Sequence, residues 1–332
     1  MPIGRGSRTE ATDFAIMKDT EGGHDWNPIH TVPLNVDSAI YRSYSPYKLK
    51  ASNALWSNYC FAPLPFGARP MNRIDLPAHD RAIVDQFTRQ AVGFAAGPEL
   101  HADEVLALMV NAAGLGPNDH AIDLACGTGS VACALAKHAA HVVGVDATPA
   151  MLDQARVLAT SLELSNLDWE EGSIYAVPYA KESFHAVTCR FAFHHLENPR
   201  RAFAEMVRLT APGGRVVLCD GIASDDPAKA QAFNAMERRR DPSTVEFRTL
   251  GYLCEMFAEM GLSEPEVRMF QVSYLAADLV KASFPESDDR SGLLALIEGS
   301  IENDSLGMGA HVSVEGVRIA YQSVVLSAVK LD

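Results

Sequence analysis

The chain has 332 residues, roughly two domain-equivalents of ~150 residues each, and can form a core without disulfides or metals. Hydrophobic residues make up 48% and charged residues 21%, the ordinary balance of a soluble globular protein. With 28 Lys and Arg against 42 Asp and Glu, the net charge is −14, which repels polyphosphate and argues against general nucleic-acid binding.

The sequence gives no sign of export or of a membrane. The longest apolar runs, such as residues 105–110, are far shorter than the ~20 residues that a membrane span needs. The first residues contain no apolar signal core. The six cysteines form no Cys-x-x-Cys pair and do not resemble a disulfide framework. We therefore expect a cytoplasmic protein without membrane contact.

Residues 1–79 differ from the rest and are expected to form an N-terminal extension. They hold eight of the 18 prolines and nine of the aromatic residues. Disordered tails are normally poor in aromatics, so residues 25–79 are expected to be ordered but irregular, packed on the main domain or on a partner subunit. Residues 1–24 are expected to be mobile, and an unstructured extension remains the alternative. An arm of this kind favours a homodimer.

Residues 80–332 are expected to form one α/β domain, because strand and helix patterns alternate along them. Such a rhythm is typical of a parallel sheet with helices on both faces. A polar, partly helical insertion at about 275–316 is expected on the side of the substrate. The predicted strands are 120–124, 141–146, 167–171, 186–190, 214–219, 267–274 and 317–329. The predicted helices are 80–96, 98–113, 131–138, 149–161, 199–209, 227–239 and 247–261.

The segment AIDLACGTGS, residues 121–130, carries the clearest chemical signal. A strand ends in Asp123-Leu124, and a turn with Gly127 and Gly129 opens a helix, so the backbone can approach a ligand closely. Asp146 ends the next strand, where a carboxylate can accept hydrogen bonds from the two hydroxyls of a ribose. The pattern therefore predicts a nucleoside-bearing ligand across the strand ends of an open sheet.

Two features separate this ligand from a nicotinamide dinucleotide. The dinucleotide fingerprint has a third glycine, and Ala132 stands there instead. Asp123 also lies at the mouth of the turn, where it would repel a pyrophosphate and attract an ammonium group. S-adenosylmethionine has a ribose, an adenine and an α-amino group, and it has no phosphate.

Four segments in order, DLACGTG, GVDATPAML, RFAFHHLENP and LTAPGGRVVL, resemble the class I S-adenosylmethionine-dependent methyltransferases. Within that family the chain looks most like the small-molecule group of ubiquinone and menaquinone biosynthesis. The resemblance implies a Rossmann-like sheet of seven strands with helices on both faces. It also implies methyl transfer to oxygen or carbon of a small-molecule acceptor, a secondary or quinone-like metabolite, with S-adenosylhomocysteine as the second product.

The resemblance assigns cofactor-binding roles to individual residues. Asp123 would orient the amino group of the cofactor through water, Asp146 would bind the ribose, and Arg190 would offer a backbone carbonyl to the amino group. Ser173 stands where the family usually has an Asp that accepts from the adenine amino group. The full set implied by the resemblance is Phe87, Asp123, Ala125, Gly127, Gly129, Asp146, Ala147, Met151, Ser173, Ile174 and Arg190.

The pair His194-His195 follows the fourth strand, where the reactive methyl group would point. Either imidazole could be a general base for the acceptor, since its ordinary pKa lies near neutral pH; a structural role is the alternative. Arg240 lies in Arg-Asp-Pro-Ser, similar to an acceptor-binding segment of the family, and the alternative is a solvated helix end. No cluster with metal-ligand spacing is present, so no metal is expected.

Three other functions compete with methyl transfer. A protein with this fold can bind the cofactor and catalyse a different reaction or only serve as a binding protein. A nicotinamide oxidoreductase is disfavoured by the missing third glycine. A nucleic-acid methyltransferase is disfavoured by the net charge and by the absence of an Asn/Asp-Pro-Pro-Tyr/Phe segment.

Overall fold

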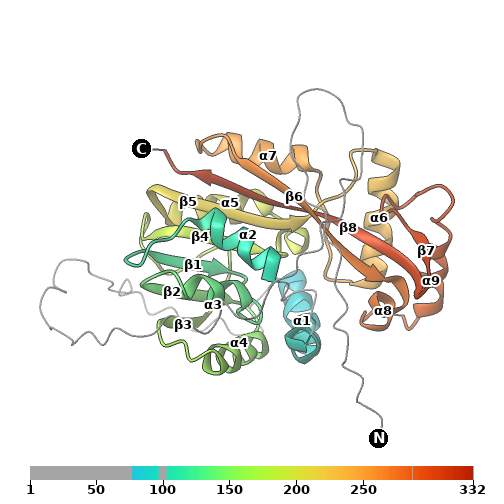
Figure 1. Cartoon of the computed structure of the whole chain (residues 1–332), viewed down its shortest axis with the longest axis horizontal. Coiled ribbons are helices and arrows are strands. Elements are labelled where there is room, and N and C mark those ends of the chain that lie inside the picture. Colours follow the sequence, from blue (N-terminus) through green and yellow to red (C-terminus); the bar gives the residue numbers. More distant parts are fainter. Residues whose placement is uncertain (1–76, 97–102, 286, 332) are drawn as a thin grey trace, which may run out of the picture.

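A computed structural model of the chain describes residues 77–96, 103–285 and 287–331, and these form an α/β structure around one twisted sheet (Figure 1). Seven strands follow the order β3-β2-β1-β4-β5-β8-β6, and a short β7 pairs with β8. The strands are β1 (His120–Leu124), β2 (His141–Asp146), β3 (Leu167–Glu171), β4 (Phe184–Arg190), β5 (Thr210–Gly221), β6 (Glu266–Leu275), β7 (His311–Ser313) and β8 (Gly316–Val329).

Strands β1 to β5 are parallel, and β8 runs antiparallel to both β5 and β6. β1 lies between β2 and β4, so the strand order reverses at this point. The chain leaves neighbouring strands in opposite directions there, and a crevice opens at their carboxyl ends. The topology alone therefore places a ligand site beside the ends of β1, β2 and β4.

Helices cover both faces of the sheet because the central strands are apolar on both sides. The buried side chains of α2 (Asp103–Ala113) and α3 (Ser130–Ala136) pack on one face. Those of α5 (Pro199–Leu209) and α7 (Leu250–Glu259) pack on the other. α4 (Pro149–Ser161) lies near α3 and β3, and α1 (Ala78–Ala96) packs beside α4 (Figure 1). No described helix is long and apolar enough to cross a membrane.

A second lobe forms where β6 and β8 extend beyond the central sheet (Figure 1). Its apolar core joins residues of α6 (Pro227–Arg240), α8 (Ala276–Lys281) and α9 (Arg290–Glu298) to β8. Phe233, Met236, Leu293 and Ile297 are each at most 5% exposed in this core. The lobe is therefore packed on the sheet through its own core and includes the insertion expected at about 275–316.

Trp169 on β3 explains two glycines of the central sheet. A Cβ built on Gly144 would lie 2.5 Å from two atoms of the Trp169 ring, and one on Gly129 would lie 2.6 Å from the same ring. Only hydrogen fits at both positions, since real Cβ atoms do not approach other heavy atoms this closely. The indole thus ties β3 to β2 and to the start of α3.

The predicted strands and helices are confirmed with small changes at their ends. β5 begins at Thr210 rather than at 214, because its pairing with β4 resumes after an irregularity between Phe184 and Ala186. β7 adds a three-residue strand to the predicted seven. The helix expected at 98–113 is described from Asp103, and nearly all of the 1–79 extension lies outside the described residues.

We predict that Gly144→Ala lowers the free energy of unfolding by about 1–3 kcal/mol, because the new methyl group overlaps the Trp169 ring. Urea unfolding followed by circular dichroism measures the change. Gly251→Ala is the matched control: this glycine is exposed on α7, and its Cβ would meet only Thr249 Oγ1 at 3.9 Å. That control should change stability by less than about 1 kcal/mol. Equal effects of the two substitutions would contradict the packing argument.

Candidate active site

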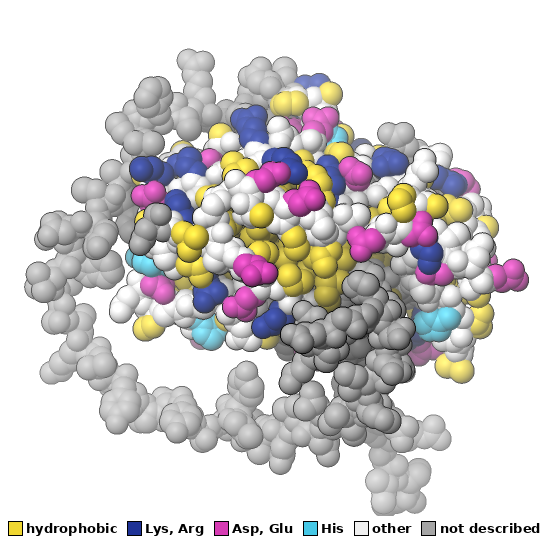
Figure 2. All heavy atoms as spheres, turned by 90° about the horizontal axis from the view of Figure 1, so that it is seen from above, with side chains coloured by type: hydrophobic (Ala, Val, Ile, Leu, Met, Phe, Trp, Pro, Cys, Tyr) yellow, Lys and Arg dark blue, Asp and Glu magenta, His cyan; other side chains and the backbone are white. Residues whose placement is uncertain are grey.

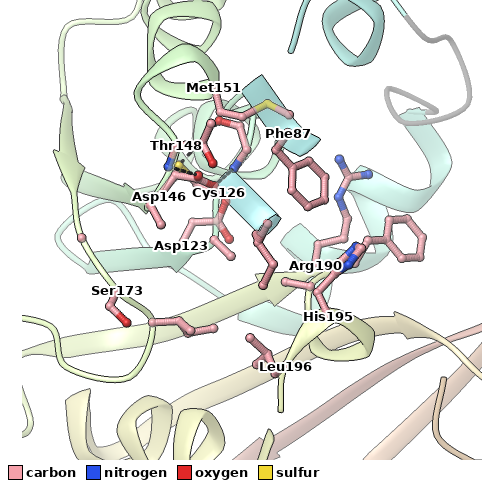
Figure 3. A pocket seen from close by; sticks show the side chains of 18 of the residues that line it. Phe87, Asp123, Cys126, Asp146, Thr148, Met151, Ser173, Arg190, His195 and Leu196 are labelled. Atoms are coloured by element: carbon pink, nitrogen blue, oxygen red, sulfur yellow. Dashed lines mark hydrogen bonds between the residues drawn. The ribbon is translucent and has the colours of Figure 1, made fainter. Parts of the chain in front are cut away.

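A cavity opens at the carboxyl ends of β1, β2 and β4, where the strand order reverses (Figure 3). The turns after these strands form its floor, and Asp80, Ile83 and Phe87 of α1 line it from the other side. Every predicted cofactor-binding residue except Gly129 lines this cavity. Residues that are far apart in the sequence are thus brought to one place by the sheet.

The turn after β1 has an unusual backbone. Ala125, Gly127 and Gly129 all have positive φ, at 53°, 54° and 81°. A Cβ at Gly127 would meet no atom within 4 Å, so this glycine faces open space in the cavity. Gly129 serves packing instead, since it caps α3 and lies against Trp169. Phe191, after β4, also lines the cavity with a positive φ of 52°. Non-glycine residues in this conformation concentrate at functional sites.

Asp123 is a buried carboxyl group at the end of β1, with 1% of its surface exposed. Thr188 Oγ1 donates a hydrogen bond of 2.7 Å to its Oδ1. Burial raises the pKa of Asp123 to about 7, although the Thr188 bond and the charge of Arg190 lower it. A carboxylate here is therefore costly in the ligand-free protein, and a cationic group in the cavity would stabilise it.

Asp146 at the end of β2 organises the floor of the cavity. Its Oδ2 accepts from the Gly127 N–H at 2.8 Å and its Oδ1 from the Thr148 N–H at 2.8 Å. Burial raises the pKa of Asp146, and these backbone hydrogen bonds oppose that rise. The Thr148 hydroxyl bonds the same carboxylate, so of its about four acceptor positions one remains for a hydroxyl group of a ligand.

The remaining predicted cofactor residues surround these two carboxyl groups (Figure 3). Ala147 and Met151 follow β2, and Ser173 and Ile174 follow β3. Ser173 Oγ accepts from the Tyr175 N–H at 3.3 Å, so the hydroxyl can still donate to a ligand. Burial lowers the pKa of Arg190, the last residue of β4.

The two histidines have different surroundings. His194 Nδ1 lies 2.6 Å from Asp220 Oδ1, and its ring stacks on Phe247 with the centroids 4.2 Å apart. His194 does not line the cavity, whereas His195 does. Burial lowers the pKa of His195, and the neighbouring His194 lowers it further. Both rings are buried, but only His195 is placed to meet a ligand.

Arg240, which was predicted to bind the acceptor, does not line this cavity. Its guanidinium donates to both carboxylate oxygens of Glu237 at 2.8–3.0 Å. Glu237 is completely buried and is also bonded by the Tyr321 hydroxyl. Arg240 therefore neutralises a buried carboxylate three residues earlier on α6, a spacing that places the two side chains on one face.

The Arg-Asp-Pro-Ser segment reaches the site through Ser243 and Asp241, which were not among the predicted site residues. Ser243 Oγ lies 3.0 Å from His195 Nδ1 and donates to Asp241 Oδ1 at 2.6 Å. The Arg-Asp-Pro-Ser pattern had marked this segment, but nothing local shows which side chain faces the cavity. Among the described residues no group of three or more His, Cys, Asp or Glu could hold a metal ion.

Residues 122–218 match the family described as methyltransferase domain. The chain is 31% identical over 274 residues to the uncharacterized protein Rv1405c of Mycobacterium tuberculosis, a match of 77% of this chain and 99% of that protein. The crystal structure of YcgJ from Bacillus subtilis superposes with a TM-score of 0.64 at 23% identity, covering 69% of this chain and 99% of YcgJ. The chain belongs to the class I S-adenosylmethionine-dependent methyltransferases.

The relatives of this methyltransferase include the group that the sequence motifs resemble. A demethylmenaquinone methyltransferase of Deinococcus radiodurans is 44% identical over 101 residues. That match covers 30% of this chain and 42% of the relative, so the chain spans less than half of that enzyme. The shared part therefore shows that the two chains are related. The methyl acceptor of the Deinococcus radiodurans enzyme is known for that enzyme alone.

We predict that Asp123 makes the ligand-free methyltransferase less stable as the pH rises. Its pKa is about 7 in the folded protein against 3.8 for the free side chain, so the folded state holds the proton more tightly. The destabilisation therefore begins as the pH rises above the pKa of the unfolded chain, 3.8, and is complete above the pKa of the folded protein, about 7. Asp123→Asn removes this cost, so its stability advantage over the wild type should grow by about 3 kcal/mol from about pH 5 to about pH 8.

Urea unfolding of both proteins at several pH values measures this difference. Asp153→Asn is the control, because Asp153 is exposed on α4 and forms a surface ion pair with Arg156. A difference between Asp123→Asn and the wild type that stays constant with pH would contradict the prediction.

Proposed function

We propose that this methyltransferase binds S-adenosylmethionine in the cavity between α1 and the strand ends and transfers its methyl group to a small-molecule acceptor. The observation that carries the proposal is the placement of Asp123 and Asp146 at the ends of adjacent strands, inside one cavity. A buried carboxyl group whose ionisation is costly fits the ammonium group of the cofactor. A carboxylate with an acceptor position left fits a ribose hydroxyl.

The other lining residues support the same ligand. Met151 and Ile174 offer apolar surface for an adenine ring beside Ala147, and Ser173 and the Ile174 N–H can meet its polar edge. Arg190 offers its backbone carbonyl near Asp123, as the family resemblance implies. Gly127 leaves room for the methionine part of the cofactor next to Ala125. Phe87 covers the site from α1.

The chemistry of the site follows from these positions. When bound, S-adenosylmethionine supplies a methyl group on a positively charged sulfur. The acceptor atom attacks the methyl carbon in line, and the sulfur is the leaving group. Ile83 and Phe87 exclude water from the cavity, and the floor residues hold the reacting partners in line. His195 faces the cavity and accepts the proton that an O–H or C–H acceptor loses.

A lowered pKa suits His195 for this task. Burial keeps its imidazole neutral at physiological pH, so one ring nitrogen has a lone pair available. A hydroxyl group becomes far more acidic while a methyl group bonds to its oxygen. A weak base in contact with it is therefore sufficient if the proton leaves as the methyl arrives. His194, bonded to Asp220 behind His195, is proposed to support the position of its neighbour.

The acceptor is proposed to be a small molecule of quinol, phenol or enol character, methylated at oxygen or carbon. The named relatives include demethylmenaquinone methyltransferases, which supports this class. The second lobe is proposed to close the acceptor side, since Gln86 of α1 donates a hydrogen bond to the Phe284 carbonyl at 3.3 Å. Positive and negative side chains alternate over the face seen in Figure 2, which suits a small acceptor better than a nucleic acid.

The homodimer formed through the N-terminal extension stays a prediction, because residues 1–76 lie outside the described part of the chain. The division into an extension and a domain starting near residue 80, and the cytoplasmic location, stay predictions as well. The described helix α1 begins at Ala78, close to that boundary.

We predict that S-adenosylhomocysteine binds the cofactor-stripped full chain and that NAD does not. Calorimetric titration at about pH 8 and at about pH 6 measures the affinity for each of the two ligands. Because the ammonium group needs an ionised Asp123, affinity should fall by about tenfold on going to the lower pH. Asp123→Asn should bind weakly and without this pH dependence. Binding of NAD in preference to S-adenosylhomocysteine would refute the cofactor assignment.

We predict that methyl-labelled S-adenosylmethionine transfers label to at least one member of a panel of phenols, quinols and enolisable carbonyl compounds. His195→Ala should then slow single-turnover transfer by about 100-fold or more while leaving S-adenosylhomocysteine affinity unchanged. His138→Ala, on the exposed end after α3, is the control. Unchanged transfer in His195→Ala would end the assignment of this base. Cofactor binding with no transfer to any acceptor would favour the alternative, a non-methylating reaction or a binding protein.

A further inference from the structure

His195 is connected on the side of its Nδ1 atom to a serine and a carboxylate, and the proposed base depends on them. We propose that Ser243 and Asp241 hold His195 in the tautomer that carries its proton on Nδ1, so that the unprotonated Nε2 serves the acceptor. Both would be positioning residues, since neither lines the cavity. The proposal rests on the proposed function for its catalytic consequence, but the tautomer itself can be measured without any acceptor.

The direction of the hydrogen bonds follows from counting protons. The Ser243 hydroxyl has one proton, and its oxygen lies 2.6 Å from Asp241 Oδ1. Two acceptors at that distance would repel each other, so the hydroxyl donates to the carboxylate. The same oxygen lies 3.0 Å from His195 Nδ1, and with its proton committed it can only accept there. His195 must then donate from Nδ1, which leaves the lone pair on Nε2.

The carboxylate at the end of this chain is ionised. Burial alone would raise the pKa of Asp241, but the positive charge of Arg240 and the hydrogen bonds from the side chain and backbone of Ser243 lower it. The Ser243 N–H also donates to Asp241 Oδ1 at 3.0 Å. Asp241 is 4% exposed and Ser243 is 1% exposed, so water does not compete for these bonds. The low local dielectric strengthens the chain of hydrogen bonds.

The fold fixes the segment 241–246 against His195 through the backbone as well. The carbonyl of His194 accepts from the N–H groups of Val245 and Glu246 at 2.9 and 3.0 Å. The Thr244 N–H donates to the Asp241 carbonyl at 3.0 Å, which closes the turn after α6. The serine and the histidine are 48 residues apart in the chain, yet these contacts hold them in register.

Other groups also surround the imidazole of His195. Phe87 packs edge-on with the ring centroids 5.0 Å apart, and the His194 ring lies 4.1 Å away. His79 Nε2 bonds the backbone carbonyl of His195 at 2.7 Å, and Asp220 acts on the ring through its charge. Among the described residues, the Ser243 hydroxyl is the side-chain partner of Nδ1, and a hydrogen bond of the ring with the Ser243 backbone raises the pKa of His195.

The tautomer is tested directly by nuclear magnetic resonance of the ligand-free full chain with ¹⁵N-labelled histidine. The His195 signals are assigned by their absence from the His195→Gln variant. In the wild type we expect a neutral ring with its proton on Nδ1, and in Ser243→Ala a mixture of both tautomers. A wild-type ring with its proton on Nε2, or a Ser243→Ala ring identical to the wild type, would overturn the proposal.

Thr244→Val is the matched control, because Thr244 adjoins Ser243 and is 3% exposed, and its Oγ1 has no hydrogen-bond partner. Valine has nearly the same shape, so this variant should leave the His195 signals unchanged. Loss of the Nδ1–H form in this control as well would show that packing of the turn sets the tautomer, and would overturn the role of Ser243.

If Ser243→Ala does not fold, the His195 signals of Asp241→Asn are measured against pH instead. Without the negative charge, the pH at which His195 takes up a proton should fall.

Kinetics test the consequence with the first acceptor that the labelled screen identifies. Ser243→Ala should lower kcat by about 10- to 100-fold with KM and S-adenosylhomocysteine affinity changed less than about twofold. Ser243→Thr, which keeps the hydroxyl, should recover most of that loss, and Thr244→Val should show none. If no acceptor is methylated, the proposed function fails while the resonance experiment still decides the tautomer. A normal kcat in Ser243→Ala would overturn the catalytic part of the proposal.

Discussion

The arrangement of the site depends on one topological constraint, the reversal of strand order at β1. Because β2 lies on one side and β4 on the other, the turns that follow these strands diverge and leave their carboxyl ends open. Asp123 and Asp146 end adjacent parallel strands and therefore share this opening, although 22 residues separate them in the sequence. The turn after β1 takes left-handed backbone at Ala125 and Gly127, and the Gly127 N–H donates to Asp146.

The sheet and its helices were largely predictable, because their signals are local. Short apolar stretches mark β1 and β2, and Pro149 and Pro199 mark the first turns of α4 and α5. The sequence was a poorer guide to the ends of a strand that are set by pairing with a neighbouring strand. The start of β5 contains Pro212 and Gly213, which break any local strand pattern, yet Thr210 pairs with Phe184 across an irregularity. Only the neighbouring strand makes this segment part of the sheet.

The site shows the same division between local and distant signals. Asp123 and Asp146 lie at the carboxyl ends of β1 and β2 and Ser173 follows β3, so the sequence motifs could predict that the three residues share one site. Gly129 has the spacing of a ligand-binding glycine, but a tryptophan from β3 fills the space in front of it. Arg240 looked free to bind an anion, but Glu237 occupies it. The partnership of His195 with Ser243 joins two distant turns, and no periodicity within either turn can reveal it.

One physical effect acts on both sides of the cavity. The apolar lining that excludes water raises the pKa of Asp123 and lowers the pKa of His195, so it drives both groups toward their neutral forms. For Asp123, this neutrality is a state that a cationic ligand reverses on binding. For His195, the proposed base, neutrality is the working state, because a base must be unprotonated before it acts. Burial therefore couples charge at one end of the cavity to the presence of ligand. At the other end it keeps the proposed base unprotonated, and in our proposal the hydrogen bond with Ser243 decides only which nitrogen is available.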